Sequence, residues 1–449
     1  MAHPAQAALP SEEREIDVVR KETAELWKLS WPVVLSRLGI MVMGLSDAIV
    51  VGRFSATQLG YHALAWAPTS VVVTMCVGLL TGVQVMTARR IGQGRRELTG
   101  VVLRRGLSYG FWIGMVSMAV TLAAGPTFLH VIGLEKDLAD GAAKAMLIFA
   151  LSLPGYAFSV AASFWLEGLG KPKPGAVMMW LANGVNLALL LVLVPGAFGL
   201  PALGAVGGAW ATTGARTFLA LAMLAYIWRM PEARALGVFN KPERDKPSEV
   251  EQRRIGYGAG ASNFFEVAAF ASMNIFAGWM GGLHVAALVF MVPLGLSTGT
   301  AVMVGRAYGA RDARGVTRAG LIGFGMTAAF GLVISLVIWP TAGLISQAYT
   351  SDKMVLAMAS AALVLSCLFF LVDALQVVIA QALRARGDVW LPTFTHLTSY
   401  VLVMMPLAWF LAIHLKIGLN GIVWAVIAAS FLSAGLLSAR FWMLARRGL

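Results

Sequence analysis

Charged residues are scarce in this chain of 449 residues, where they make up 13% of the sequence against 58% hydrophobic residues. A soluble domain is about half apolar and a quarter charged, so this shortage excludes an ordinary soluble protein and predicts an integral membrane protein. Cysteine is also rare. The two that are present, Cys76 and Cys367, both fall within apolar segments, which argues against a disulfide framework.

Motifs of soluble enzymes are missing as well. The sequence contains no Gly-x-x-x-x-Gly-Lys-Ser/Thr loop that would hold the phosphates of ATP. The pattern Gly-x-Ser-x-Gly occurs at 106–110 and 295–299, but both stretches lie within long apolar runs, so neither indicates the nucleophile turn of a soluble hydrolase. The six histidines show no metal-ligand spacing. These absences argue against an enzyme, and we expect no cofactor.

Long apolar runs fill most of the chain instead. A bilayer span needs about 20 mostly apolar residues, and the sequence predicts twelve such spans. They cover approximately residues 29–51, 62–88, 106–124, 142–166, 175–195, 206–228, 258–280, 284–305, 319–339, 354–378, 391–413 and 419–440.

The distribution of positive charge predicts the orientation of these spans. The formal net charge is +13, and 28 of the 35 lysines and arginines lie in the amino-terminal tail and in alternate loops, against four in the opposite loops. Cytoplasmic loops carry such an excess of lysine and arginine, so both termini are expected in the cytoplasm. The expected location is the inner membrane of a bacterium. Because the basic residues are spread as topology signals, nucleic acid is not an expected partner.

Polar segments divide the chain into parts. The first 28 residues carry many charges, so they predict no cleavable signal peptide but a short helix at the membrane surface. The longest polar stretch lies midway and resembles a linker. The expected parts are a cytoplasmic segment 1–28, a first lobe 29–228, a linker 229–257, a second lobe 258–440 and a tail 441–449.

The two halves resemble each other. "TGVQVMTARRIG" at 81–92 matches "TGTAVMVGRAYG" at 298–309 with an offset of 217 residues. "LGAVGGAWA" at 203–211 matches "IGLNGIVWA" at 417–425 with an offset of 214. Six spans per half is an even number, so the halves are expected to be parallel bundles related by an axis along the membrane normal. Transporters built in this way bind their substrates between the repeats.

Three acidic residues lie well inside predicted spans: Asp47, Glu266 and Asp373. A carboxylate at the centre of a bilayer costs about 3 kcal/mol, and such residues usually mark an ion or substrate path. Glu266 and Asp373 belong to the same half, so their helices can bring both to one site. Each disfavours the ionisation of the other, which favours uptake of a proton there, and the same oxygens would suit Na+.

Other polar residues in the spans have a structural explanation beside a functional one. Asn183 and Asn186 can join helices by hydrogen bonds, and Asn263 can satisfy Glu266. Arg37 can equally be a packing residue. Glu167 lies near the end of a span and is expected at the membrane interface.

These residues occur in motifs that resemble the multidrug and toxic compound extrusion (MATE) family, in particular its NorM-type branch, over nearly the whole chain. "MGLSDAIVVGR" resembles the motif of the first helix with its acidic residue, and "NFFEV" and "DALQVV" resemble the motifs of the second lobe with their carboxylates. "SYVLVMMP", which contains Tyr400, resembles the motif of the eleventh helix. Leu190 and Phe369 depart from the family pattern, in which a polar residue and a tyrosine are common.

The resemblance implies an all-α membrane protein, a monomer of twelve helices in two parallel six-helix bundles. It also implies a secondary antiporter that exports drug-like or dye-like organic cations in exchange for H+ or Na+. Asp47, Glu266, Asp373 and Asn186 would bind the coupling ion or the substrate, with Na+ possible at Glu266 and Asp373. Arg37, Asn183, Asn263 and Tyr400 are further candidates.

Three alternatives remain open from the sequence. The first is a transporter of the major facilitator type, which also has twelve spans in two parallel halves. The second is a flippase for lipid-linked precursors from the same wider superfamily, although such proteins commonly have cationic cavities. A channel or receptor is the third.

Overall fold

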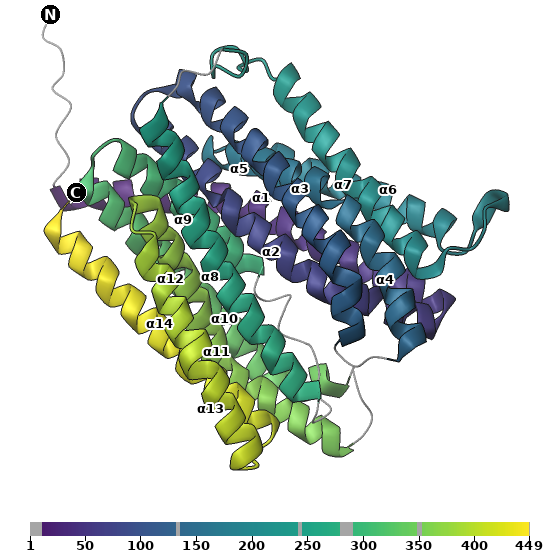
Figure 1. The fold of residues 1–449 in the computed structure, drawn as a ribbon. Helices are drawn as coiled ribbons and strands as arrows, with labels where there is room; N and C mark the ends of the chain where they lie inside the picture. Colours follow the sequence, from purple (N-terminus) through teal and green to yellow (C-terminus); the bar gives the residue numbers. More distant parts are fainter. Residues whose placement is uncertain (1–10, 132–134, 241–244, 279–290, 348–352, 449) are drawn as a thin grey trace, which may run out of the picture.

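The computed structural model describes residues 11–131, 135–240, 245–278, 291–347 and 353–448, and this part of the chain consists of helices joined by turns, without a β-strand (Figure 1). The longer helices are α1 (Ser11–Phe54), α2 (Ala56–Gly92), α3 (Thr99–Val131), α4 (Lys136–Leu151), α5 (Leu153–Gly168), α6 (Lys173–Leu193), α7 (Gly204–Arg229), α8 (Lys246–Gly278), α9 (Met291–Gly309), α10 (Ala313–Gln347), α11 (Lys353–Arg386) and α14 (Leu419–Arg447). The shorter ones are η1 (Arg96–Leu98), η2 (Ala197–Gly199), α12 (Trp390–His396), η3 (Leu397–Met404), α13 (Met405–Trp409) and η4 (Phe410–His414).

Over its described residues, each of the twelve predicted spans falls on one or more helices, so the predicted fold class is confirmed. Within the described residues, eight segments are long and apolar enough to cross a membrane, and the pair α4 and α5, bent by 44°, makes a ninth. The predicted spans on α7, α8 and α9 are the remaining three. α9 is rich in glycine and threonine and is buried from Pro293 to Gly305, so protein rather than lipid surrounds it. The predicted start of the eighth span, at 284–290, lies outside the described residues.

The eleventh predicted span is a rod of four successive segments, α12, η3, α13 and η4. Both η3 and η4 have the wide turns of a π-helix. Pro406 is the second residue of α13, just past the end of η3, and has no amide hydrogen to donate to the preceding turn. Single π-helical turns occur frequently at functional sites, and this one carries Tyr400.

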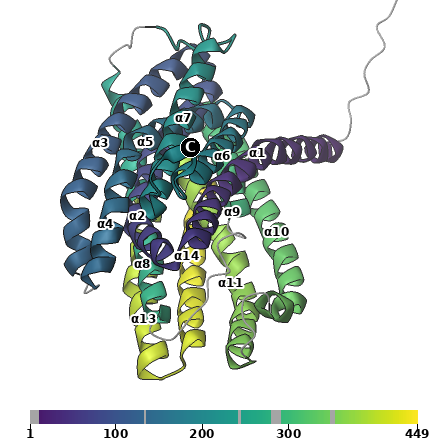
Figure 2. The ribbon, with the colours of Figure 1, turned by 90° about the vertical axis from the view of Figure 1, so that its right-hand side faces the viewer.

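The helices form two bundles that are separate in Figure 1: α1–α7, here called the N-lobe, and α8–α14, here called the C-lobe. The start of α1 and the end of α14 lie at the same end of the molecule in both ribbon views (Figure 1, Figure 2). We call this the inner end, because the charge distribution predicts that it faces the cytoplasm.

The lobes meet along the inner part of α2, which packs against α8 and α9. A Cβ atom added at Gly78 would lie 2.6 Å from the Cα atom of Gly260, so the two backbones touch. Nearer the inner end, a Cβ at Gly92 would collide with the carbonyl oxygen of Arg306, and a Cβ at Gly309 with that of Arg89. Gly92 and Gly309 are equivalent positions of the two repeats, as are Arg89 and Arg306. The internal repeat therefore forms the contact between the lobes.

The amino-terminal segment does not form a separate helix, because α1 runs unbroken from Ser11 to Phe54. Its first turns project sideways from the bundles (Figure 2), and Ile16 and Trp27 there are 67% and 53% exposed. Large exposed apolar side chains on a projecting helix favour a position at the membrane surface. Glu22 anchors the segment to α10, since Arg318 donates to both of its carboxylate oxygens.

Candidate functional site

In the N-lobe, Asp47 lies on α1 and is only 3% exposed. Asn186 on α6 donates to its Oδ1 at 2.7 Å, and Thr212 on α7 donates to its Oδ2 at 2.7 Å. His62 on α2 lies farther away, with its Nε2 atom 3.9 Å from Oδ2. Four helices therefore converge on one carboxylate, and the two short hydrogen bonds stabilise its charged form.

The sequence predicted Asp47 and Asn186 as neighbours in function, but it did not indicate Thr212. Leu190, where a second polar ligand was expected from the family pattern, is fully buried in an apolar cluster with Val51 and Val194. The structure therefore places the second donor to Asp47 on α7 rather than one turn farther along α6.

In the C-lobe, Glu266 on α8 and Asp373 on α11 are brought together, as the sequence predicted. Gln376 joins them, because its Nε2 atom lies 3.4 Å from Oε1 of Glu266 and 3.4 Å from Oδ1 of Asp373. Tyr400 on η3 donates to the same Oδ1 at 3.3 Å, and thus supplies a phenol at the carboxylate pair although position 369 is a phenylalanine. Asp373 is 2% exposed, while the Glu266 side chain remains 16% exposed.

A second polar group extends from Glu266 toward the inner end. His396 on α12 holds its Nδ1 atom 3.7 Å from Oε2 of Glu266 and 2.7 Å from the hydroxyl of Ser262 on α8. Ser262 also accepts a hydrogen bond of 2.7 Å from Arg384 on α11. The sequence analysis did not indicate these three residues. Gln376 could have been found, since it lies one helical turn from Asp373.

The lower-priority candidates occupy other places. Arg37 lies 3.9 Å from Glu167 and stacks on Phe164, 5.6 Å from the ring centre. Glu167, expected at the membrane interface, is instead 4% exposed and accepts a hydrogen bond from Gln84, so that expectation was wrong. Its position one residue past the end of the predicted span 142–166 hid the fact that α5 packs inside the N-lobe.

The two remaining asparagines join helices. Asn183 on α6 donates to the carbonyl oxygen of Gly39 on α1 at 3.0 Å. Asn263 on α8 donates to that of Thr74 on α2 at 3.4 Å, which connects the two lobes. These contacts fit the structural explanation of both residues, because an amide that satisfies a main-chain carbonyl holds two helices together.

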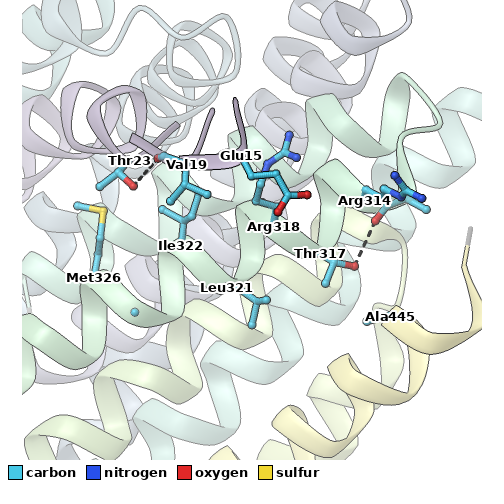
Figure 3. Close-up of a pocket in the computed structure, with 12 residues that line it drawn as sticks. Glu15, Val19, Thr23, Arg314, Thr317, Arg318, Leu321, Ile322, Met326 and Ala445 are labelled. Atoms are coloured by element: carbon cyan, nitrogen blue, oxygen red, sulfur yellow. Dashed lines mark hydrogen bonds between the residues drawn. The ribbon is translucent and has the colours of Figure 1, made fainter. Parts of the chain in front are cut away.

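A cavity of about 740 Å³ lies apart from these acids. It opens between the start of α1 and α10 (Figure 3), where Val19, Ile322 and Met326 form an apolar wall and Glu15 and Arg314 lie at the rim. It adjoins neither Asp47 nor Glu266, so it is not part of the candidate site.

Within the described residues, no three or more histidine, cysteine, aspartate or glutamate side chains cluster as they would around a metal ion. Glu266 and Asp373 are interior carboxylates of the C-lobe, and Asp47 is an interior carboxylate of the N-lobe. Because they lie in the interior, a proton or a cation that neutralises them removes an unfavourable buried charge.

The pattern of the MatE family matches residues 32–192 and 259–410, one match in each lobe. The chain belongs to the MatE family. The matches include Asp47, Asn186, Glu266 and Asp373. Membership excludes the major facilitator alternative and makes the chain a multi-pass membrane transporter rather than an enzyme.

Two curated relatives of this MatE protein carry the same name, "Probable multidrug resistance protein NorM". The one from Caulobacter vibrioides is 60% identical over 98% of this chain and 94% of its own length. The one from Bradyrhizobium diazoefficiens is 29% identical over 95% of this chain and 94% of its own length. The predicted resemblance to the NorM-type branch is confirmed by these relatives.

Solved structures of MATE transporters share the fold. The eukaryotic MATE transporter AtDTX14 superposes with a TM-score of 0.85 at 17% sequence identity, covering 96% of this chain and 98% of its own. A MATE family transporter of the MOP superfamily in an outward-facing conformation also gives 0.85, at 18% identity, covering 95% and 96% of the two chains. At these identities the likeness concerns the arrangement of helices.

Proposed function

We propose that this MatE protein is a secondary multidrug antiporter that exports organic cations from the cytoplasm in exchange for H+ or Na+. Glu266 and Asp373 hold the coupling ion and the cationic substrate in turn. The observation that carries the proposal is the pairing of these two carboxylates on Gln376 in the interior of the C-lobe. The name of the relatives, multidrug resistance protein, supports the substrate class.

The exchange follows from charge. Two carboxylates at one buried site carry two negative charges, and the burial of both charged forms is unfavourable. A proton, a sodium ion or an organic cation relieves this cost, and each ligand competes with the others for the same oxygens. Exchange becomes obligatory when the coupling ion and the substrate prefer different arrangements of the lobes, and the difference in affinity limits the coupling.

Asp47 is proposed as a second cation-binding carboxylate, with Asn186 as its neighbour. Its two hydrogen bonds to Asn186 and Thr212 must weaken when a proton or ion occupies Asp47. The proposed orientation places both termini in the cytoplasm of a bacterium, with the chain in the inner membrane. Since both acidic sites lie within one chain, a monomer is the proposed functional unit.

The proposal is tested by efflux of ethidium from proteoliposomes under a Na+ gradient and, separately, a pH gradient. Asp373→Asn and Glu266→Gln keep the size of the side chains but remove their charge, so both variants are expected to lose gradient-driven efflux at least tenfold. Asp140→Asn is the matched control, because Asp140 is half exposed and pairs only with His130 in the described structure. Full efflux by both C-lobe variants would refute the mechanism.

The flippase alternative is tested in the same vesicles. A transporter for lipid-linked precursors would move a fluorescent pyrophosphate-linked lipid between leaflets and would not respond to ethidium. The acidic character of both sites favours the cation antiporter, because carboxylates repel pyrophosphate.

A further inference from the structure

A chain of polar contacts runs from the C-lobe acid pair to the contact between the lobes. It begins where Oε2 of Glu266 faces the His396 ring at 3.7 Å. His396 shares a hydrogen bond of 2.7 Å with Ser262, and Ser262 accepts from the Arg384 guanidinium at 2.7 Å. Of these residues, Ser262, His396 and Arg384 are at most 2% exposed, so water does not compete for the bonds between them.

Arg384 is linked in turn to the N-lobe. Its carbonyl oxygen accepts a hydrogen bond of 3.4 Å from Nη2 of Arg89 on α2, and the next carbonyl, that of Ala385, accepts one of 3.0 Å from Nε. Nη1 of the same guanidinium lies 3.3 Å from Glu251 on α8. Arg89 therefore holds the last turn of α11 at the place where α2 and α9 touch.

Among the described residues of the N-lobe, no equivalent chain occurs at this position. The repeat offset of 217 residues pairs Arg384 with Glu167, so a base in one lobe stands where the other has an acid. Glu167 accepts from Gln84 and Ser163, which belong to its own lobe. Arg306, the counterpart of Arg89, does reach across and donates to the carbonyl of Leu169 at 3.1 Å. Arg89 and Arg306 thus make equivalent contacts across the lobes. Only the contact of Arg89 is connected to a carboxylate in the protein interior, Glu266, among the described residues.

We propose that His396, Ser262 and Arg384 are positioning residues that transmit the occupancy of Glu266 to the inner contact between the lobes. The inference rests on the proposed function, since it takes Glu266 as a site of cation exchange. An empty, charged Glu266 attracts the Arg384 guanidinium and keeps the last turn of α11 in place for Arg89. A cation or proton on Glu266 removes this attraction, and Arg384 and its main chain are then free to move.

The charges around Glu266 are consistent with this role. Asp373 and Arg384, both on α11, act on it with opposite sign, and His396 faces it from α12. The other polar residues of this cluster in the described structure are uncharged: Asn263 on α8, Gln376 on α11, Tyr400 on η3 and Ser433 on α14. Arg384 is therefore the one resident cation that an incoming cation has to replace in this part of the structure.

The decisive variant is Ser262→Ala, which breaks the chain without touching a charge. Its matched control is Ser399→Ala, since Ser399 is an equally buried serine of the C-lobe whose hydroxyl has no hydrogen-bond partner in the described structure. Three quantities are measured in the full-length protein: ethidium affinity at equilibrium, gradient-driven ethidium efflux, and the distance between spin labels at the inner end. Cysteines introduced at the exposed positions Arg95 and Ala310 carry the labels.

For Ser262→Ala we expect ethidium affinity within twofold of the parent, efflux lowered at least tenfold, and loss of the change in label distance that the coupling ion causes in the parent. Ser399→Ala should match the parent in all three. Arg384→Gln should behave as Ser262→Ala does, and Arg384→Lys should recover part of the efflux because it restores a charged donor.

The inference is overturned if Ser262→Ala keeps the efflux and the distance change of the parent, or if Ser399→Ala loses them equally. It is also overturned if Ser262→Ala loses ethidium binding together with efflux while remaining folded, since the serine would then belong to the binding site itself. Normal efflux by Glu266→Gln and Asp373→Asn is a different result, because it rejects the proposed function.

Discussion

Removal of the Arg89 side chain is expected to open the inner end. The guanidinium donates to two carbonyl oxygens at the end of α11, at 3.0 and 3.4 Å, and is 7% exposed. A hydrogen bond to a charged group contributes about 1.5–3 kcal/mol. Taking the lower value for each bond, Arg89→Ala destabilises the closed inner contact by about 3 kcal/mol, which is roughly a hundredfold change in the ratio of closed to open molecules.

Arg306→Ala should have a smaller effect. Arg306 donates to a single carbonyl, that of Leu169, and its second partner is the half-exposed Glu25. An exposed ion pair contributes 0–1 kcal/mol. With the lower value for each contact, as for Arg89, the expected loss is about 1.5 kcal/mol and the shift in the population ratio is roughly tenfold. Arg89 and Arg306 occupy equivalent positions of the two repeats. The changes that the two variants cause in the ratio of closed to open molecules should nevertheless differ by about a factor of ten.

The assay is the distribution of distances between spin labels on Arg95→Cys and Ala310→Cys, which follow the inner ends of α2 and α9. Cys76 and Cys367 are 0% and 5% exposed, so the introduced cysteines can be labelled selectively. Lys171→Met is the control. The Lys171 ammonium lowers the pKa of the exposed Glu232, but this pair lies within the N-lobe and should not affect the distance. The reasoning is refuted if Arg89→Ala leaves the distribution unchanged, or if Lys171→Met shifts it as far.

Three further predictions concern packing and charge. Asn186→Leu and Thr212→Val each remove a hydrogen-bond donor that lies 2.7 Å from buried Asp47. Each should therefore lower the free energy of unfolding by about 2 kcal/mol, as measured by thermal unfolding. If a second change, Asp47→Asn, restores the stability, the unpaired carboxylate is the cause. Gly309→Ala should disturb the inner contact, because the added methyl group collides with the Arg89 carbonyl oxygen. At Gly325 the added methyl group meets open space, so Gly325→Ala should raise the stability of the helix by roughly 1 kcal/mol. If both variants give the same label distances, the close approach at Gly309 is contradicted. Glu22→Gln weakens the ion pair that anchors α1 to Arg318. Amide hydrogen exchange should therefore become faster between Glu15 and Thr23, while exchange at Asp47 stays the same. Unchanged exchange between Glu15 and Thr23 would show that the anchor is dispensable.

The fold and much of the site follow from the sequence because they depend on strong, local signals. Apolar length predicts the spans, and a carboxylate inside a span is conspicuous. The internal repeat also marked the contact between the lobes, since Gly92 and Gly309 coincide with the points of closest approach. The functional roles of Asp47, Glu266 and Asp373 remain proposals.

Residues that act through neighbours on other helices were not predictable. Thr212 is an ordinary helical threonine until the fold places it against Asp47. His396 ends α12 directly before the π-helical turns of η3, which change the direction of side chains relative to a regular helix and leave no clear pattern in a single sequence. Glu167 was misjudged because distance from a span end does not reveal which helices are enclosed by others.

The mutual fit of Gly92 with Arg306 and of Gly309 with Arg89 bears on the origin of the chain. Each repeat offers both a small residue and a bulky neighbour to the other, as in an interface between two identical subunits. A half-length chain that carried this glycine and this arginine would therefore contain both sides of the contact and could dock with a second copy of itself. In the present chain the two repeats keep this mutual contact although they differ at Arg384 and Glu167, so the lobes can be specialised separately while the contact between them is preserved.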